Sequence, residues 1–396
     1  MRRAMSGSRA AVAALMLVSA LFAPHAVRAE EPELRTGAER TELYFPLLEG
    51  RRTAVLANHT SIVGGGENLV DMLCREGVNV VGIFSPEHGF RGTADAGEHV
   101  GDSVDEATGV PVRSLYDGRK LRPSDEVMRS FDILLVDLQD VGLRFYTYYI
   151  TMLRMMEACA EFDREVVILD RPNPNGMYTD GPLLDMKYKS GVGALPIPVV
   201  HGMTMGEIAR MAAGEGWCRK PKMTVVPVVN YRRSMRYVLP VAPSPNLKTQ
   251  HAVYLYPSLC LFEGTVASLG RGTDFPFEVY GHPDMKGCGF SFTPRSTFGA
   301  KNPPLKDRIC FGVDLRAKSD DEIVAEGFNL EYVIDACRNL GMGDAFFTPF
   351  FEKLTGVDYI RRMILEGCPA AEIRAVWRDD VERFKRAREP YLLYAE

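Results

Sequence analysis

The sequence predicts an α/β protein with a doubly wound, mostly parallel sheet and a second, smaller α/β domain. Two observations lead to this prediction. Short apolar runs, typical of strands buried on both faces of a parallel sheet, alternate with helical segments along the first half of the chain. Several of these runs end in polar segments rich in Gly or Pro, as strands do at the carboxyl edge of such a sheet.

The chain is organised around residues 131–149, FDILLVDLQDVGLRFYTYY. Residues 133–136 are continuously apolar, so we expect a buried central strand there. The strand leads into Asp137, Asp140 and Arg144 and then into a group of tyrosines. In an open α/β sheet, ligands bind in the crevice outside the carboxyl ends of the strands. The alternative is that the two carboxylates only cap the helix that follows.

The other elements follow in order from apolar runs and helix signals. We expect strands at residues 53–57, 78–84, 165–169 and 223–229, extended segments at residues 111–115 and 196–202, and helices at residues 67–76, about 146–162 and 204–213. Ser124 is expected to cap a short helix, and Thr204 with Glu207 to form a capping box. This alternation is Rossmann-like, with right-handed connections.

Four of the expected strands end in polar segments, at residues 58–59, 87–88, 137–144 and 170–171. Parallel strands bring all their carboxyl ends to one edge of the sheet. A single polar strand end is explained by capping, whereas four that face each other indicate a pocket.

The first 29 residues resemble a secretory signal peptide, with a basic start, an apolar run at residues 10–22 and small residues before the expected cleavage point. We therefore expect an exported protein, periplasmic or secreted, without a membrane anchor. Cleavage removes four arginines and no acid, which takes the formal charge from −5 to −9. So acidic a chain argues against nucleic acid or an anionic membrane as the main partner.

The remaining 367 residues suggest two domains. A Pro-rich stretch at residues 240–245 is the expected hinge, which gives domains at residues 40–238 and 239–396. In the second part we expect helix near residues 245–261, a strand at residues 309–315 and structural helices up to residue 388, with Trp377 and Phe384 on an apolar face. The loop at residues 270–278 is rich in Gly and charge, and we expect it to be held against another part of the protein.

No cofactor is predicted. The chain contains neither GxGxxG nor GxxxxGK[ST], so a nucleotide cofactor is poorly supported. The histidines that could gather around a metal lack ligand spacing; they are His59, His88, His99 and His201. None of the eight cysteines forms a CxxC pair, and buried free thiols are the expectation.

Seven motifs together resemble a known family. They are SPEHGFRG at residues 85–92, DLQDVGLRFYTY at 137–148, LDRPNPNG at 169–176, HGMTMGE at 201–207, PSPN at 243–246, EGT at 263–265 and GRGTDFPFE at 270–278. In this order they resemble the YbbC-like family of bacterial exo-β-N-acetylmuramidases (NamZ-type, glycoside hydrolase family 171), over nearly the whole chain from residue 47. The resemblance implies a Rossmann-like domain followed by a smaller α/β domain. It also implies an exported enzyme of peptidoglycan breakdown or recycling that releases N-acetylmuramic acid from the non-reducing end of glycan fragments.

Glycoside hydrolysis needs a carboxylic acid that protonates the leaving oxygen and usually a second carboxylate across the sugar. The family's Glu-His motif maps onto Glu87 and His88, so Glu87 is the expected general acid, with His88 orienting it. Asp137, Asp140 and Glu263 compete for the second role. Asp140 is the first choice, and its alternative role is a helix cap.

The substrate of the family also carries a lactyl carboxylate, whose natural partner is Arg. Arg144, Arg171 and Arg271 are the candidates, and Arg271 could instead pair with Asp274 or Glu278. Tyr146 and Tyr148 could stack on the sugar ring, although aromatic residues on a helix more often belong to the core. The predicted donors to sugar hydroxyls or to the N-acetyl group, each with a structural alternative, are Asn58, Asn173 and His201.

The chain departs from the family pattern at residues 280–284 (YGHPD) and 246–249 (NLKT), which bears on subsite preference more than on the reaction. Two other functions compete. A cell-wall esterase or amidase would be favoured by a GxSxG elbow, which is absent from the sequence. A non-catalytic binding protein for muramic-acid-containing sugars would need the same pocket without a catalytic acid.

Overall fold

The computed structural model describes residues 33–87, 89–91, 101–115 and 122–396. The predicted signal peptide, His88 and His99 lie outside these residues. From Leu34 to Glu396 the chain forms one unit. The boundary predicted near residue 239 therefore stays a prediction.

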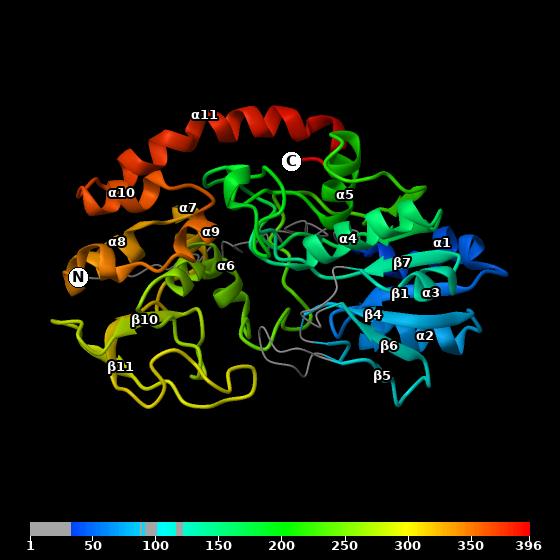
Figure 1. Cartoon of the computed structure of the whole chain (residues 1–396), viewed down its shortest axis with the longest axis horizontal. Helices are drawn as coiled ribbons and strands as arrows, with labels where there is room; N and C mark the ends of the chain where they lie inside the picture. Colours follow the sequence, from blue (N-terminus) through cyan, green and yellow to red (C-terminus); the bar gives the residue numbers. More distant parts are fainter. Residues whose placement is uncertain (1–32, 88, 92–100, 116–121) are drawn as a thin grey trace, which may run out of the picture. The chain divides into compact units, whose positions relative to one another are not determined.

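The central feature is a seven-stranded sheet in the order β5-β6-β4-β1-β7-β8-β9 (Figure 1). Neighbours from β6 to β9 pair in parallel, and β5 pairs antiparallel with β6 at the edge. This arrangement confirms the predicted fold class. The strands are β1 (Thr53–Ala57), β4 (Val80–Ser85), β5 (Ser103–Val104), β6 (Pro111–Ser114), β7 (Ile133–Asp137), β8 (Glu165–Leu169) and β9 (Met223–Val226), and a separate hairpin joins β2 (Ile62–Val63) and β3 (Glu67–Asn68).

Both faces of this sheet are covered, because successive side chains of a strand point to opposite faces. Leu134 and Val136 of β7 belong to a core that includes α4 (Tyr148–Glu161) and α5 (Met205–Gly214). Ile133 and Leu135 belong to a second core, which includes α1 (Thr41–Leu48) and α2 (Leu69–Arg75). Burial on both sides explains why the strand is apolar without alternation.

The predicted helix starts are confirmed where capping residues mark them. Ser124 accepts a hydrogen bond from the Val127 amide at the start of α3 (Asp125–Arg129). Thr204 and Glu207 form the capping box of α5. The convergence of strand ends is confirmed as well, because β4, β1, β7 and β8 are parallel neighbours.

The second part of the chain contains a three-stranded antiparallel sheet in the order β10-β12-β11. The sequence predicted only β12 of these strands, and it predicted Trp377 and Phe384 on an apolar face, where both are buried. The elements are β10 (Val279–His282), β11 (Phe290–Phe292), β12 (Cys310–Asp314), α6 (Gln250–Leu259), α7 (Asp320–Glu326), α8 (Glu331–Leu340), α9 (Phe351–Thr355), α10 (Tyr359–Leu365) and α11 (Ala370–Arg388). Short 3-10 turns are η1 (Gly37–Glu39), η2 (Gly64–Gly66), η3 (Met186–Tyr188), η4 (Cys260–Gly264), η5 (Gly343–Phe346) and η6 (Glu389–Tyr391).

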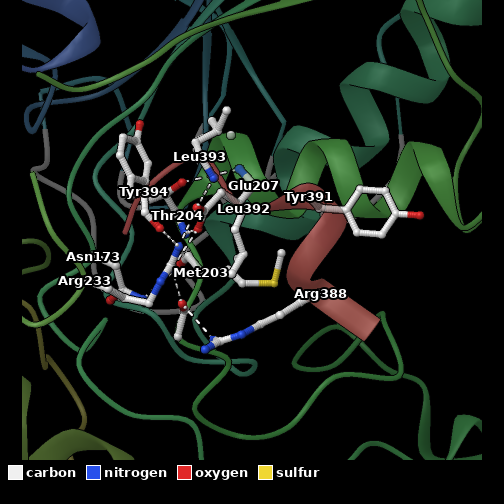
Figure 2. A network of polar contacts seen from close by, with 12 residues as sticks. Asn173, Met203, Thr204, Glu207, Arg233, Arg388, Tyr391, Leu392, Leu393 and Tyr394 are labelled. Atoms are coloured by element: carbon white, nitrogen blue, oxygen red, sulfur yellow. Dashed lines mark hydrogen bonds and ion pairs between the residues drawn. The ribbon is translucent and has the colours of Figure 1, made fainter. Parts of the chain in front are cut away.

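The last residues of the chain, 392–396, return to α5 and the end of β8, and we call them the C-terminal strap. The Leu393 amide donates to Glu207 Oε1 at 2.7 Å, and Arg233 Nη2 donates to the Tyr394 carbonyl at 3.1 Å (Figure 2). The Tyr394 hydroxyl donates to Asp170 Oδ2 at 2.6 Å. The strap thereby provides hydrogen-bond partners for buried polar groups of the first domain. Without these partners the buried groups would lower the free energy of unfolding.

Within the described residues, no helix is both long and apolar enough to cross a membrane. No group of three or more metal-ligating side chains is found in the same part of the chain. All eight cysteines lie among the described residues and are free; five of them are buried, whereas Cys74, Cys288 and Cys368 are partly exposed.

Candidate active site

Glu87 lies in the turn that follows β4, two residues beyond the strand. The Thr147 hydroxyl donates to Glu87 Oε2 at 3.0 Å. Thr147 is the N-cap residue of α4, so the start of this helix fixes the position of the carboxylate. The strand end and the helix start thus bring together two groups that are 60 residues apart in sequence.

Glu87 lines a cavity of about 810 Å³, which we call the first cavity. This volume is typical of small-molecule sites. Four of the predicted site residues line it together: Glu87, Tyr146, Glu263 and Arg271. Tyr148, a predicted stacking residue, lines it as well.

Glu263 and Arg271 form an ion pair on the wall of this cavity. Arg271 Nε donates to Glu263 Oε1 at 2.8 Å, and Nη2 donates to the same oxygen at 2.5 Å. The guanidinium lies over the Phe277 ring, 5.0 Å from its centroid. Nη1 has no hydrogen-bond partner among the described residues, so it remains available to a ligand. The alternatives Asp274 and Glu278 are not the partners of Arg271.

The tyrosines are held by one another and by the backbone. The hydroxyls of Tyr146 and Tyr148 donate to the Pro243 carbonyl at 2.8 and 3.3 Å. Their rings meet edge to face, with centroids 4.7 Å apart. Burial raises the pKa of both hydroxyls, so they act as donors and not as bases. The rings form a rigid wall of the first cavity.

Asp140 is buried beside the cavity but is not among its lining residues. Its Oδ1 accepts from the Gly142 amide at 2.6 Å, whereas Oδ2 has no partner in the described structure. Burial raises the pKa of this carboxyl to about 7, against the opposing hydrogen bonds from the Gly142 and Val141 amides. Asp140 does not cap α4, whose N-cap residue is Thr147.

His201 faces Asp140, with Nε2 4.0 Å from Oδ1. His201 Nδ1 accepts from the Met203 amide at 3.2 Å, and Nε2 has no partner among the described residues. Burial, followed by the charges of Arg388, Arg233 and Arg144, lowers the pKa of His201 to about 3. Near neutral pH the pair therefore consists of an uncharged imidazole beside a carboxyl that is close to its titration point.

We expect Asp140 to make stability depend on pH. A carboxyl with a raised folded-state pKa holds its proton while the unfolded chain has already lost it. The free energy of unfolding therefore falls as pH rises from about 4, the ordinary Asp value, toward about 7. Asp140→Asn removes this loss and keeps an acceptor for the Gly142 amide, so the variant should gain stability relative to wild type at pH 8 but not at pH 4, as measured by urea unfolding. The control is Asp379→Asn at an exposed position, and equal shifts at both pH values in Asp140→Asn would contradict the assignment.

The other predicted ligand-binding residues have structural partners. Asp137 and Arg171 form a fully buried bidentate pair, with Nε–Oδ1 at 2.5 Å and Nη2–Oδ2 at 2.8 Å. Asn58 Oδ1 accepts from the Thr60 amide at 2.9 Å, and Asn173 Nδ2 donates to the Met203 carbonyl at 2.9 Å. None of these four residues lines the first cavity.

Arg144 has the most unusual surroundings. Its guanidinium is fully buried and donates to four backbone carbonyls, at residues 182, 197, 354 and 355, over 2.6–2.9 Å. No carboxylate in the described structure pairs with it, and burial lowers its pKa to about 10. Arg144 thus links the segment between β7 and α4 to the end of α9 and does not line the cavity.

Several lining residues were not predicted from the sequence. Thr147 fixes the position of Glu87, but its partner is 60 residues away in sequence, and a threonine at a helix start is already explained as an N-cap residue. Asn246 belongs to the PSPN motif, and its Nδ2 donates to the Gly299 carbonyl at 2.7 Å. The other lining residues without a sequence signal include Arg154, Tyr256 and Lys301.

The doubly wound sheet, and a cavity at its strand ends that is lined by two glutamates and two arginines, define an α/β protein with a carboxylate-bearing small-molecule site. Residues 53–251 match the family described as "Exo-beta-N-acetylmuramidase NamZ, N-terminal", and residues 254–394 match its C-terminal counterpart. The chain therefore belongs to the NamZ family of exo-β-N-acetylmuramidases.

Individual relatives agree with this assignment. The chain is 38% identical to the peptidoglycan β-N-acetylmuramidase NamZ of Bacillus subtilis, over 92% of both chains. Two solved structures of DUF1343 family proteins from Bacteroides fragilis share the fold over 92% of this chain and all of theirs. The first has a TM-score of 0.87 at 57% identity, and the second has a TM-score of 0.78 at 28% identity.

Proposed function

We propose that this protein is an exo-acting β-N-acetylmuramidase that releases N-acetylmuramic acid from the non-reducing end of peptidoglycan-derived fragments. The observation that carries the proposal is Glu87, held by Thr147 at the wall of the first cavity, in a chain that matches both halves of the NamZ family. A glycosidase needs such a positioned carboxyl to protonate the leaving oxygen.

In the proposed reaction, Glu87 gives its proton to the glycosidic oxygen as the bond to the aglycone breaks, and water supplies the hydroxyl group that the anomeric carbon of the released sugar gains. Thr147 holds one carboxyl oxygen, Oε2, in place at the wall of the first cavity. Glu263 is the second carboxylate that lines the same cavity, whereas Asp137 and Asp140 are buried outside its lining. Glu263 is therefore better placed than Asp140 for the role across the sugar ring.

Arg271 has a separate part in recognition. Glu263 occupies Nε and Nη2 of the guanidinium, and Nη1 lacks a partner among the described residues. A lactyl carboxylate is an acceptor that Nη1 can bind, and N-acetylglucosamine lacks this group. Arg271 thereby distinguishes the muramic sugar from its neighbour in the glycan.

Arg271→Lys should weaken this discrimination. A lysine keeps the charge but loses the planar fork, so we expect kcat/KM for a muramide to fall about 10- to 100-fold, as for the loss of a charged hydrogen bond. The measurement is the affinity for N-acetylmuramic acid relative to N-acetylglucosamine by calorimetry, beside the kinetics. An unchanged preference between the two sugars would contradict the role of Arg271.

We also propose that the protein is exported to the periplasm or secreted, since the first 29 residues have the composition of a signal peptide. The substrate of the proposed reaction is a cell-wall fragment, which fits such a location. Fractionation of cells that express the full chain, with mass spectrometry of the mature N-terminus, tests this proposal.

The test of the activity is release of para-nitrophenol from para-nitrophenyl β-N-acetylmuramide, with the β-N-acetylglucosaminide as the control substrate. We expect turnover of the muramide only. If neither substrate is turned over but N-acetylmuramic acid still binds in calorimetry, the protein is a sugar-binding protein and not an enzyme.

A further inference from the structure

A second cavity, of about 710 Å³, adjoins the first. Both cavities are lined by Ile150 and Arg154 of α4. The loop at residues 189–194 also borders both, because Gly191 and Val192 line the first cavity whereas Lys189 and Ser190 line the second. One helix and one loop thus form the border that the two cavities share.

The loop is firmly held. Ser190 and Gly193 exchange backbone hydrogen bonds at 2.8 and 3.3 Å. The Ala194 amide donates to the Tyr149 hydroxyl oxygen at 3.1 Å, which fixes this end of the loop to α4. The border between the cavities is therefore a built feature of the fold.

The charge of the second cavity is opposite in sign to that of the whole chain. Four cations line it, Arg122, Arg154, Lys189 and Arg219, against the carboxylates of Glu157 and Glu161, whereas the chain carries −5. Arg122 pairs with Glu161 at 3.4 Å.

The other three cations, Arg154, Lys189 and Arg219, have no side-chain hydrogen bond or ion pair within the described residues. A concave site with surplus, uncompensated positive charge favours an anionic ligand.

The second cavity also has an apolar wall. Trp217 is partly buried and lies with Leu153, Ala158 and Leu195 in the lining. An aromatic ring with a polar edge suits the alternating apolar and hydroxyl-bearing faces of a sugar. Positive charge beside an indole therefore indicates a carboxylate-bearing sugar more than a simple inorganic anion.

We propose that the second cavity binds the aglycone of the substrate, where its cations recognise the next carboxylate along the glycan. The inference rests on the proposed function. In peptidoglycan every second sugar carries a lactyl group, whose carboxyl group is a free carboxylate where the stem peptide has been removed. In such a peptide-free fragment the terminal carboxylate at Arg271 is followed by another after one intervening N-acetylglucosamine. From Tyr148 to Glu161, α4 extends roughly 20 Å along both cavities, which is room for more than one sugar ring.

Arg154 borders both cavities, so it lies where the leaving chain passes from one to the other. A stem peptide attached to the lactyl group would present carboxylates of the same chemistry. Peptide-free and peptide-bearing substrates distinguish a lactyl carboxylate from the carboxylates of a stem peptide.

The test uses the double variant Lys189→Glu/Arg219→Glu, which changes exposed residues outside the first cavity. The substrates are para-nitrophenyl β-N-acetylmuramide, a peptide-free tetrasaccharide with muramic acid at its non-reducing end, and the same tetrasaccharide with stem peptides. We expect the small substrate to be unaffected, and kcat/KM for the peptide-free tetrasaccharide to fall about tenfold, mainly through KM, because two favourable charges become repulsive. A fall only with the peptide-bearing substrate would assign the cavity to stem peptides and overturn the lactyl assignment.

The matched control is Arg378→Glu/Arg386→Glu on α11, which makes the same change in net charge at exposed positions. Equal losses in both double variants, or an unchanged ratio of tetrasaccharide to small-substrate kcat/KM, would overturn the proposal. Calorimetry gives the corresponding ratio of affinities for the tetrasaccharide and the small substrate, so the test does not depend on turnover. If the wild-type protein turns over none of the three substrates, the proposed function fails. The proposal for the second cavity is then tested by the tetrasaccharide affinities of the variants alone.

Discussion

Replacing Glu87 by glutamine is expected to lower kcat on a muramide by about 10²- to 10⁴-fold, the usual contribution of a positioned general acid. Glutamine keeps the size of the side chain and an oxygen that accepts from Thr147, so the turn after β4 should be preserved. Since only the transferable proton is lost, KM should change little. Stopped assays with excess enzyme measure the residual rate.

Two further variants make this result specific. Thr147→Val removes the hydroxyl that holds Glu87 but leaves the carboxyl, and we expect a loss of about tenfold, in line with one hydrogen bond to a charged group. Glu366→Gln, at an exposed position outside the first cavity, should leave kcat unchanged. If Glu87→Gln retains more than a tenth of the wild-type rate, another residue must be the acid.

The largest effect on stability is expected from Arg233→Met. Arg233 and Glu207 are both buried and make a bidentate pair, with Nη2–Oε1 at 2.7 Å and Nη1–Oε2 at 3.0 Å. The variant leaves the Glu207 carboxylate buried with the Leu393 and Thr204 amides as its remaining donors. Loss of one partner of such a pair typically costs about 3–5 kcal/mol of the free energy of unfolding, which urea denaturation measures.

The double variant Glu207→Gln/Arg233→Met separates pairing from packing. If the cost comes from an unpaired buried charge, the double variant should be more stable than Arg233→Met alone. Lys385→Met breaks an exposed ion pair with Glu382 and should cost at most about 1 kcal/mol. Similar costs for Arg233→Met and Lys385→Met would contradict this account.

The sheet and the position of Glu87 could be predicted because their signals are local. An apolar run such as residues 133–136 identifies a buried strand, and a parallel sheet fixes where the strand ends lie. The carboxylate in the loop after β4 therefore reached the cavity as expected, with Tyr146, Glu263 and Arg271.

The structural roles of the other polar residues could not be predicted, since their partners are distant in sequence and often backbone atoms. Arg144 binds four carbonyls, two of them more than 200 residues away, and carbonyls leave no trace in the sequence. Arg171 is the partner of Asp137 from the neighbouring strand, so two candidate ligand residues neutralise each other. Glu263 pairs with Arg271 although Asp274 and Glu278 are closer to Arg271 in sequence, so distance along the chain did not identify the partner.

The C-terminal strap determines when buried hydrogen bonds of the first domain can form during synthesis of the chain. Asp170 and Glu207 belong to the first domain, yet they contact Tyr394 and the Leu393 amide, which lie 224 and 186 residues further along the chain. A nascent chain therefore lacks these hydrogen bonds until residues 393 and 394 have been synthesised, long after Asp170 and Glu207. The natural place for a tag, or for a fluorescent reporter of folding, is accordingly away from this end of the chain.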